Sequence, residues 1–156
     1  MDLKELYQEI ILDHGKNPRN KKKCKDFNKD AEGHNPLCGD KVHIFLKLNK
    51  EKKVEDISFE GEGCAISIAS ASIMTETIKG KEFNVAKKIL EDFLNMLKEG
   101  SKLKTNSLSE DQNTTMMSLS GVKKFPMRVK CATLAWHAFL YAAEGKKETA
   151  NTEKTD

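Results

Sequence analysis

Apolar residues recur at helical intervals in the first segment of the chain. Leu3, Ile10 and their apolar neighbours repeat every three to four positions, a period that predicts an amphipathic helix over residues 2–14. Asp2 and Glu5 stand at the spacing of a capping box, which favours a helix start at this point. An Asn-Pro pair soon afterwards breaks the pattern and begins a polar loop rich in lysine.

The next apolar positions alternate with polar ones, as they do in half-buried strands. Residues 42–48 alternate in this way, and after a polar turn at 49–52 the alternation resumes with Ile57 and Phe59 on one side. This pattern predicts a β-hairpin. A shorter strand over 27–33 would complete an antiparallel sheet of about three strands, the minimum that is usually stable.

The second half of the chain returns to a helical period. We predict helices at 65–78, where small residues favour close packing, at 86–97, and at 126–145, which begins with a proline and ends at a glycine. The polar, turn-rich stretch 101–121 is predicted to be an insertion. Residues 146–156 contain no large apolar side chain and are predicted to form a disordered tail.

These elements predict an α+β fold, in which a small antiparallel three-stranded sheet packs against several helices. The length of 156 residues suits one domain, which we assign to residues 1–145. No apolar stretch is long enough to span a membrane. The 27 basic and 24 acidic residues leave a net charge of +3, too balanced for a nucleic-acid partner bound by counterion release. The start of the sequence resembles no export signal, so we expect a cytoplasmic protein.

Cysteines at the ends of predicted elements are the main candidates for chemistry. Cys38 precedes a strand, Cys64 precedes a helix rich in small residues, and Cys131 lies in the first turns of the last helix. In the cytosol such thiols stay reduced, which favours metal binding or thiol chemistry over disulfides. Together with Asp40 they would supply the four donors that Zn²⁺ prefers. Arg128, one turn before Cys131, is the best candidate to offset the negative charge of that set.

Spacing alone leaves a structural interpretation open for each of these residues, because no Cys-x-x-Cys pair is present. A single cysteine is often a small buried apolar residue, and an aspartate after glycine is often a turn residue. Cys24, inside a run of lysines, is assigned a structural role. His34 is a rival ligand. Ser67, Ser70 and Ser72 lack a nucleophile-elbow motif, so their small volume is their expected contribution.

Four short motifs follow one another along the chain, at residues 17–20, 35–40, 59–72 and 128–134. They begin with Asn-Pro-Arg-Asn, Asn-Pro-Leu-Cys-Gly-Asp, Phe-Glu-Gly-Glu-Gly-Cys and Arg-Val-Lys-Cys. Together they resemble the iron–sulfur assembly proteins of the NifU N-terminal (IscU/SufU) family over about residues 3–144. The resemblance implies a SufE/NifU-like sandwich fold.

The resemblance also implies a metal site on Cys38, Asp40, Cys64 and Cys131. The scaffold branch of the family, IscU, assembles a 2Fe–2S cluster and typically has a histidine before the third cysteine. This chain has Lys130 there, and its 101–121 stretch resembles the insertion of the SufU branch, whose members bind zinc. The sequence is therefore placed in the SufU branch.

For that branch the resemblance implies a zinc-dependent sulfurtransferase that works with a SufS-type cysteine desulfurase. A residue of the desulfurase would displace Cys38 from zinc, and Cys38 would accept the persulfide sulfur for downstream scaffold or acceptor proteins. The alternative is an IscU-type scaffold that builds a 2Fe–2S cluster on the same ligands. A third possibility is a structural zinc module that regulates a partner.

Overall fold

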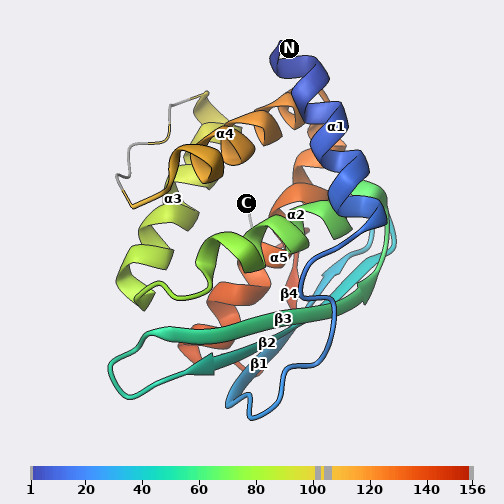
Figure 1. The fold of residues 1–156 in the computed structure, drawn as a ribbon. Coiled ribbons are helices and arrows are strands. Elements are labelled where there is room, and N and C mark those ends of the chain that lie inside the picture. Colours follow the sequence, from blue (N-terminus) through green and yellow to red (C-terminus); the bar gives the residue numbers. More distant parts are fainter. Residues whose placement is uncertain (1, 101–102, 104–106, 155–156) are drawn as a thin grey trace.

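The computed structural model describes residues 2–100, 103 and 107–154. It has helices on one face of a sheet, so the predicted α+β class is confirmed (Figure 1). The elements are α1 (Leu3–Lys16), β1 (Lys29–Asn35), β2 (Asp40–Leu48), β3 (Val54–Glu62), α2 (Ala65–Ile78), α3 (Phe83–Glu99), α4 (Glu110–Ser118), the 3₁₀ helix η1 (Leu119–Lys124), α5 (Pro126–Glu144) and β4 (Ala150–Asn151). Within the described ranges, none of the helices combines the length and hydropathy needed to cross a bilayer.

The sheet differs from the prediction by one strand. Across the described residues its order is β3-β2-β1-β4, with β1, β2 and β3 antiparallel and β4 parallel to β1. Ala150 pairs with Gly33 and is completely buried. The expected antiparallel three-stranded sheet is therefore a mixed four-stranded one, and the tail predicted to be disordered is ordered where it forms β4. Backbone pairing at the edge of β1 orders this segment, and the side-chain pattern carries no trace of it.

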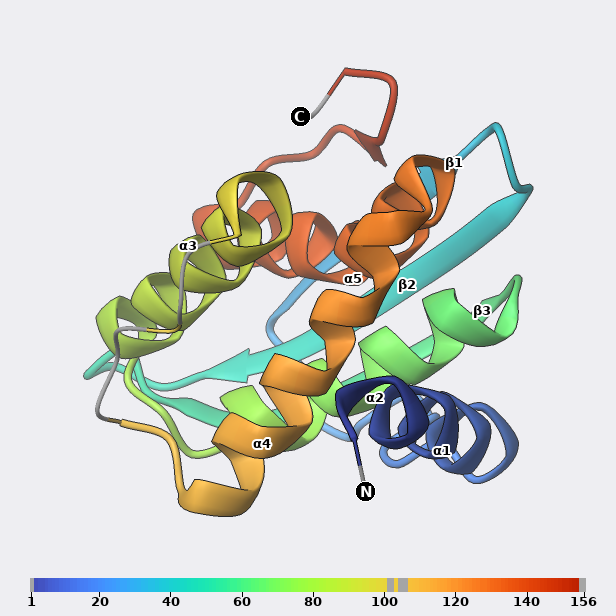
Figure 2. The same ribbon diagram turned by 90° about the horizontal axis from the view of Figure 1, so that it is seen from above.

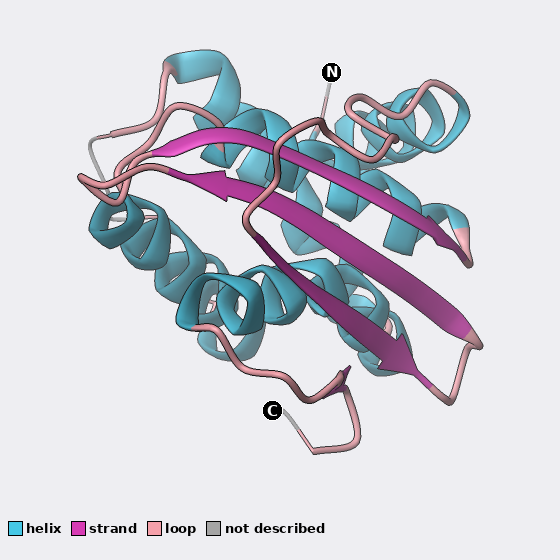
Figure 3. Ribbon diagram, turned by 90° about the horizontal axis from the view of Figure 1, so that it is seen from below, coloured by secondary structure: helices cyan, strands magenta, loops and turns pink. Residues whose placement is uncertain are grey.

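The sheet forms one layer of the fold, α2 and α5 pack on it as a middle layer, and α1 and α4 lie on the far side of α2 (Figures 1 and 2). Seen from below, the strands lie in front, and none of the helices in the described ranges covers this outer face (Figure 3). The inner face of the sheet consists of the buried apolar side chains Val42, Ile44, Leu46, Val54, Ile57 and Phe59. Trp136 of α5 is fully buried within this core. Packing against the sheet thereby sets the position of α5, which carries Cys131.

Small polar residues hold α2 against its neighbours. The hydroxyl of Ser70 donates to the carbonyl of Ala132 at 2.5 Å and accepts from the indole of Trp136 at 3.1 Å. Ser72 accepts from the backbone amide of Arg19 at 2.8 Å. Ser70 and Ser72, which were expected only to save volume, are also hydrogen-bonded, and they join α2 to α5 and to the segment after α1.

The segment between α1 and β1 runs along β3 and reaches the outer face of the sheet. The amide of Phe59 donates to the carbonyl of Asn20 at 3.0 Å, and the amide of Cys24 donates to Ser58 Oγ at 2.9 Å. The ring of Phe27 packs edge-on against Phe45. Cys24 belongs to this segment and is buried. Its position agrees with the structural role predicted for it.

Part of the predicted insertion is a folded element. Ser109 and Gln112 form a capping box at the start of α4, and Met116, Leu119 and Val122 are completely buried. The helix escaped prediction because it is short and mostly polar, and its apolar side chains cluster at its end. Residues 101–102 and 104–106 of the expected insertion lie outside the described residues.

A buried histidine links α1 to α2 and makes stability depend on pH. The imidazole of His14 lies 2.8 Å from the hydroxyl of Ser72, and burial lowers the pKa of His14 below its usual value of 6.5. As the pH falls below 6.5, His14 therefore binds its proton in the unfolded chain before it does so in the folded chain. This contribution to stability is complete above 6.5 and decreases as the pH falls below it.

We expect the free energy of unfolding to fall more in wild type than in His14→Gln when the pH is lowered from about 7.5 to about 5.5. Urea titrations at both pH values measure the difference. Contributions from other groups, including bound metal, are common to both proteins and cancel in the comparison. An equal fall in the two proteins would contradict the prediction.

Candidate metal centre

Cys38 and Asp40 are held by the turn that joins β1 to β2. Asn35, the last residue of β1, pairs with Asp40, the first residue of β2, and the amide of Gly39 donates to the carbonyl of Asn35 at 2.9 Å. Gly39 has a φ of 73°, which glycine adopts without strain. The Asn-Pro-Leu-Cys-Gly-Asp motif therefore forms a tight hairpin turn. It places Cys38, half-buried, at the tip and Asp40, fully buried, at its base.

Cys64 lies at the junction of β3 and α2, where it is the N-cap residue of the helix. Its backbone amide donates to Oδ1 of Asp40 at 2.9 Å. The preceding Gly63 has a φ of 154°, and a β-carbon there would collide with the same carboxylate. A glycine is therefore required for the chain to pass this close to Asp40, so the Gly-Cys pair is as much a part of the site as the cysteine.

Cys131 approaches from α5 and is completely buried. The donor atoms of Cys38, Asp40 and Cys131 all lie within 4.8 Å of one another. In a tetrahedral zinc site with Zn–S bonds of about 2.3 Å, sulfur atoms are about 3.8 Å apart. Cys64 is outside this group of three, but its thiol and that of Cys131 are close enough to shift each other's pKa. Side chains from three separate parts of the sequence thus meet at one point.

The surroundings of the thiols favour negative charge. The hydrogen bond from Cys131, together with the amides of Ser67 and Ile66 in the first turn of α2, lowers the pKa of Cys64 to about 6. The same contact with Cys64, together with burial, raises the pKa of Cys131. The interaction of the Arg128 guanidinium with Cys131 raises the pKa of Arg128. A cation on the same helix as Cys131 therefore lies near these thiols.

Asn35 is a member of the site to which the sequence analysis gave no role. Its side chain is completely buried, and its amide donates to Oδ2 of Asp40 at 3.1 Å and to Sγ of Cys131 at 3.4 Å. It stands in the same sequence motif as Cys38, and this proximity was the feature of the sequence that could have pointed to it. Thr152 donates to Oδ1 of Asn35 at 3.0 Å, and nothing in the sequence of the tail indicated this contact.

The donor set fits zinc. Soft thiolate sulfur and a carboxylate oxygen are ligands that Zn²⁺ accepts, and the second hydrogen bonds made by Asp40 are typical of residues that orient a metal ligand. His34, the rival ligand, is not part of the group found among the described residues. Its backbone carbonyl accepts from Thr152 at 3.1 Å, so its contribution to this region is structural.

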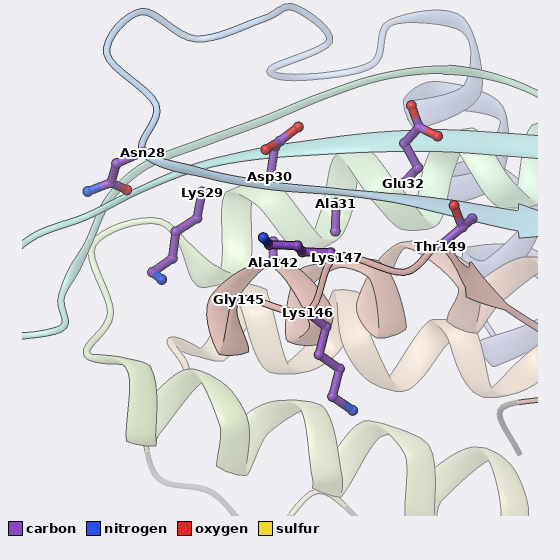
Figure 4. A pocket seen from close by; sticks show the side chains of 10 residues that line it. All are labelled: Asn28, Lys29, Asp30, Ala31, Glu32, Ala142, Gly145, Lys146, Lys147 and Thr149. Atoms are coloured by element: carbon purple, nitrogen blue, oxygen red, sulfur yellow. The ribbon is translucent and has the colours of Figure 1, made fainter.

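A separate pocket of about 440 Å³ lies between β1 and the segment after α5 (Figure 4). Asp30, Glu32, Lys146 and Lys147 are among the residues that line it. None of the predicted metal ligands belongs to its lining. This pocket is therefore distinct from the metal centre.

Comparison with known proteins points to one family. A family model described as the NifU-like N terminal domain matches residues 6–137, a range that contains all four predicted ligands. The zinc-dependent sulfurtransferase SufU of Bacillus subtilis is 42% identical over 150 residues, which cover 96% of this chain and 97% of that protein. The iron-sulfur cluster assembly scaffold protein IscU of Streptococcus pyogenes is 36% identical, over 97% of this chain and 89% of that protein.

A solved structure extends the likeness to the fold. The crystal structure of FiSufU from Fervidobacterium islandicum, described as an iron-sulfur cluster assembly scaffold protein for the SUF system, superimposes with a TM-score of 0.76. The two sequences are 34% identical, and the match covers 89% of this chain and 97% of that one. The arrangement of helices on a small sheet is thus shared with a solved relative.

Replacing Gly63 with alanine is expected to weaken zinc binding by about 10–100-fold, the usual effect of disturbing a residue that orients a metal ligand. The new β-carbon would displace the carboxylate of Asp40. Gly80→Ala is the control, because Gly80 also has a positive φ, of 83°, but faces open space. Competition with a chromophoric chelator measures both dissociation constants. Equal affinities for Gly63→Ala and wild type would refute the prediction.

Proposed function

Because this chain belongs to the NifU-like N-terminal domain family, we propose that it is an iron–sulfur cluster assembly protein that carries sulfur. In this proposal it is a zinc-dependent sulfurtransferase of the SufU branch, and Cys38 accepts persulfide sulfur from a cysteine desulfurase. The observation that carries the proposal is the convergence of Cys38, Asp40 and Cys131 within 4.8 Å in a chain 42% identical to a zinc-dependent sulfurtransferase.

Cys38, Asp40, Cys64 and Cys131 are the residues that would hold the zinc ion. When bound, Zn²⁺ stabilises the deprotonated thiols and adds no redox chemistry of its own. Asn35 and the amide of Cys64 each donate to one oxygen of Asp40. They fix the carboxylate without occupying all of its lone pairs, so it remains able to bind a metal ion.

Cys38 is the sulfur acceptor in this proposal, because it is half-buried at the tip of a turn whereas Cys131 is completely buried in a helix. The Cys38 thiolate attacks the terminal sulfur of the persulfide on the partner's cysteine. A new S–S bond forms at Cys38 as the S–S bond of the donor breaks, and the electron pair leaves with the donor's thiolate. The proton stays on the transferred sulfur, and no oxidant or reductant is needed.

Arg128 supports this chemistry by its charge. Its side chain is exposed, yet its guanidinium interacts with Cys131 and has favourable electrostatic interactions with Cys64 and Cys38. We assign Arg128 to stabilising the attacking thiolate at the site and the thiolate that leaves on the donor. Arginine suits both tasks because it stays charged at any physiological pH.

Exposed apolar side chains next to the site supply a docking surface for the desulfurase. Leu37 and Met127 are 52% and 57% exposed, and each is a near neighbour in sequence of a predicted ligand. Phe125, at the start of α5, is also 52% exposed. A SufS-type desulfurase seated on these residues would exclude water while sulfur moves to Cys38. After it leaves, scaffold or acceptor proteins would approach the persulfide by the same face.

The second candidate function is a scaffold that assembles a 2Fe–2S cluster on the same residues. The 36% identity to an iron-sulfur cluster assembly scaffold protein favours it, and iron accepts thiolate ligands as zinc does. The residue before Cys131 argues against it. The resemblance to the scaffold branch implies a histidine there, whereas this chain has Lys130, whose amine is paired with Glu153 at 2.9 Å.

Metal analysis separates the two candidates. We expect the untreated protein to be colourless with about one zinc ion per chain, since the donor set closes a tetrahedral site. Removal of zinc with a chelator should abolish sulfur acceptance, and added zinc should restore it. If anaerobic reconstitution instead yields a brown protein that passes its cluster to an apo-acceptor, the scaffold function is favoured.

Labelled sulfur tests the role of Cys38. Incubation with a SufS-type desulfurase and ³⁵S-cysteine should label wild type but not Cys38→Ser, and Arg128→Gln should be labelled about tenfold more slowly. Cys24→Ser is the matched control, because Cys24 is buried away from the donor group and should not alter labelling. Undiminished label in Cys38→Ser would refute the carrier mechanism. No label on any cysteine of the zinc-loaded wild type would favour a structural, regulatory zinc module.

A further inference from the structure

We infer that the C-terminal residues 150–154 form a clasp that orients Asn35 and thereby positions two metal ligands, Asp40 and Cys131. The inference rests on the metal site of the proposed function and adds positioning residues to it. It is carried by a buried chain of hydrogen bonds that starts at Thr152 and ends at the ligand atoms.

The amide of Asn35 has a single productive orientation. Its nitrogen carries two hydrogens and donates to Oδ2 of Asp40 and Sγ of Cys131, at 3.1 and 3.4 Å. A carboxylate only accepts hydrogen bonds, and so does a cysteine sulfur when it is a metal-bound thiolate. If the amide rotated by half a turn, its oxygen would face these two acceptors. The nitrogen must therefore point toward the ligands, and the oxygen must point away from them.

Thr152 supplies the donor that this orientation requires. Its hydroxyl lies 3.0 Å from Oδ1 of Asn35. Both residues are buried, since Asn35 is completely buried and Thr152 is only 3% exposed. Without this hydroxyl, the buried Oδ1 would lose the donor that it now has, which is an unfavourable state for a buried polar atom. Thr152 therefore favours the orientation of Asn35 that serves the ligands.

The clasp is itself fixed at two places. The amide of Thr152 donates to the carbonyl of His34 at 3.1 Å, next to the pairing of β4 with β1. Glu153 is paired with Lys130, the residue that precedes Cys131. The clasp thus bridges β1, which leads into the Cys38 turn, and α5, which carries Cys131. One end of the clasp therefore holds the strand before Cys38 and Asp40, and the other holds the helix of Cys131.

Removing the hydroxyl tests the clasp. Thr152→Val keeps the shape of the side chain, and we expect its zinc dissociation constant to rise about 10–100-fold, as for other residues that orient a metal ligand. The thiolate-to-metal absorption bands of the Co²⁺-loaded protein should change with it. Thr152→Ser retains the hydroxyl and should restore both readouts. Thr77→Val is the matched control, since Thr77 is a buried threonine whose hydroxyl donates to the carbonyl of Ile73 in the same helix, α2.

The outcomes separate the clasp from the site on which it depends. The clasp alone would be overturned if wild type binds zinc tightly and Thr152→Val has the same zinc affinity and the same cobalt spectrum. A wild type that binds no zinc would overturn the proposed function as well.

A measurement on wild type applies even if Thr152→Val does not fold. The side-chain amide protons of Asn35, followed by NMR, should exchange slowly with solvent and should shift when Cd²⁺ is added. Rapid exchange of these protons in the Cd²⁺-loaded protein would overturn the clasp.

Discussion

The candidate metal centre depends on one buried carboxylate. Asp40 is completely buried, and its two oxygens accept from the amide of Cys64 and the side chain of Asn35. A buried charge is unfavourable unless it is hydrogen-bonded or paired, so the chain must bring these donors to it. Doing so joins the β1–β2 turn to the start of α2 and, through Asn35, to α5. The interactions that hold the candidate ligands together also hold these elements together.

The three thiols stand on supports of different rigidity. Cys131 lies in the middle layer of the fold, in a helix whose Trp136 is packed in the core, whereas Cys38 lies at the tip of a turn. A thiol on a turn is able to move toward a partner at lower cost in packing than one on a buried helix. This asymmetry gives a physical reason for a carrier to use Cys38 as acceptor and the buried thiol as anchor.

The residues around the ligands distinguish a carrier from a scaffold more than the ligands do. Zinc and iron both accept the same thiolates. What distinguishes this chain is the residue before Cys131. It is Lys130, which forms an ion pair with Glu153 and has no side-chain atom that would bind a metal at neutral pH. The C-terminal residues that a sequence pattern assigns to a tail therefore touch the site from two directions, through Thr152 and through Glu153.

Local patterns in the sequence were sufficient to predict α1, α2, α3, α5, the β-hairpin and the α+β class, because helical and strand periods reflect which face of each element is buried. They also singled out Cys38, Asp40, Cys64, Cys131 and Arg128. Only the tertiary structure decided that Cys38, Asp40 and Cys131 meet, that β4 pairs with β1, and that Thr152 donates to Asn35. Those contacts join residues far apart in the chain through backbone and side-chain hydrogen bonds. Such bonds leave no periodic signal, since they depend on where the packed elements come together.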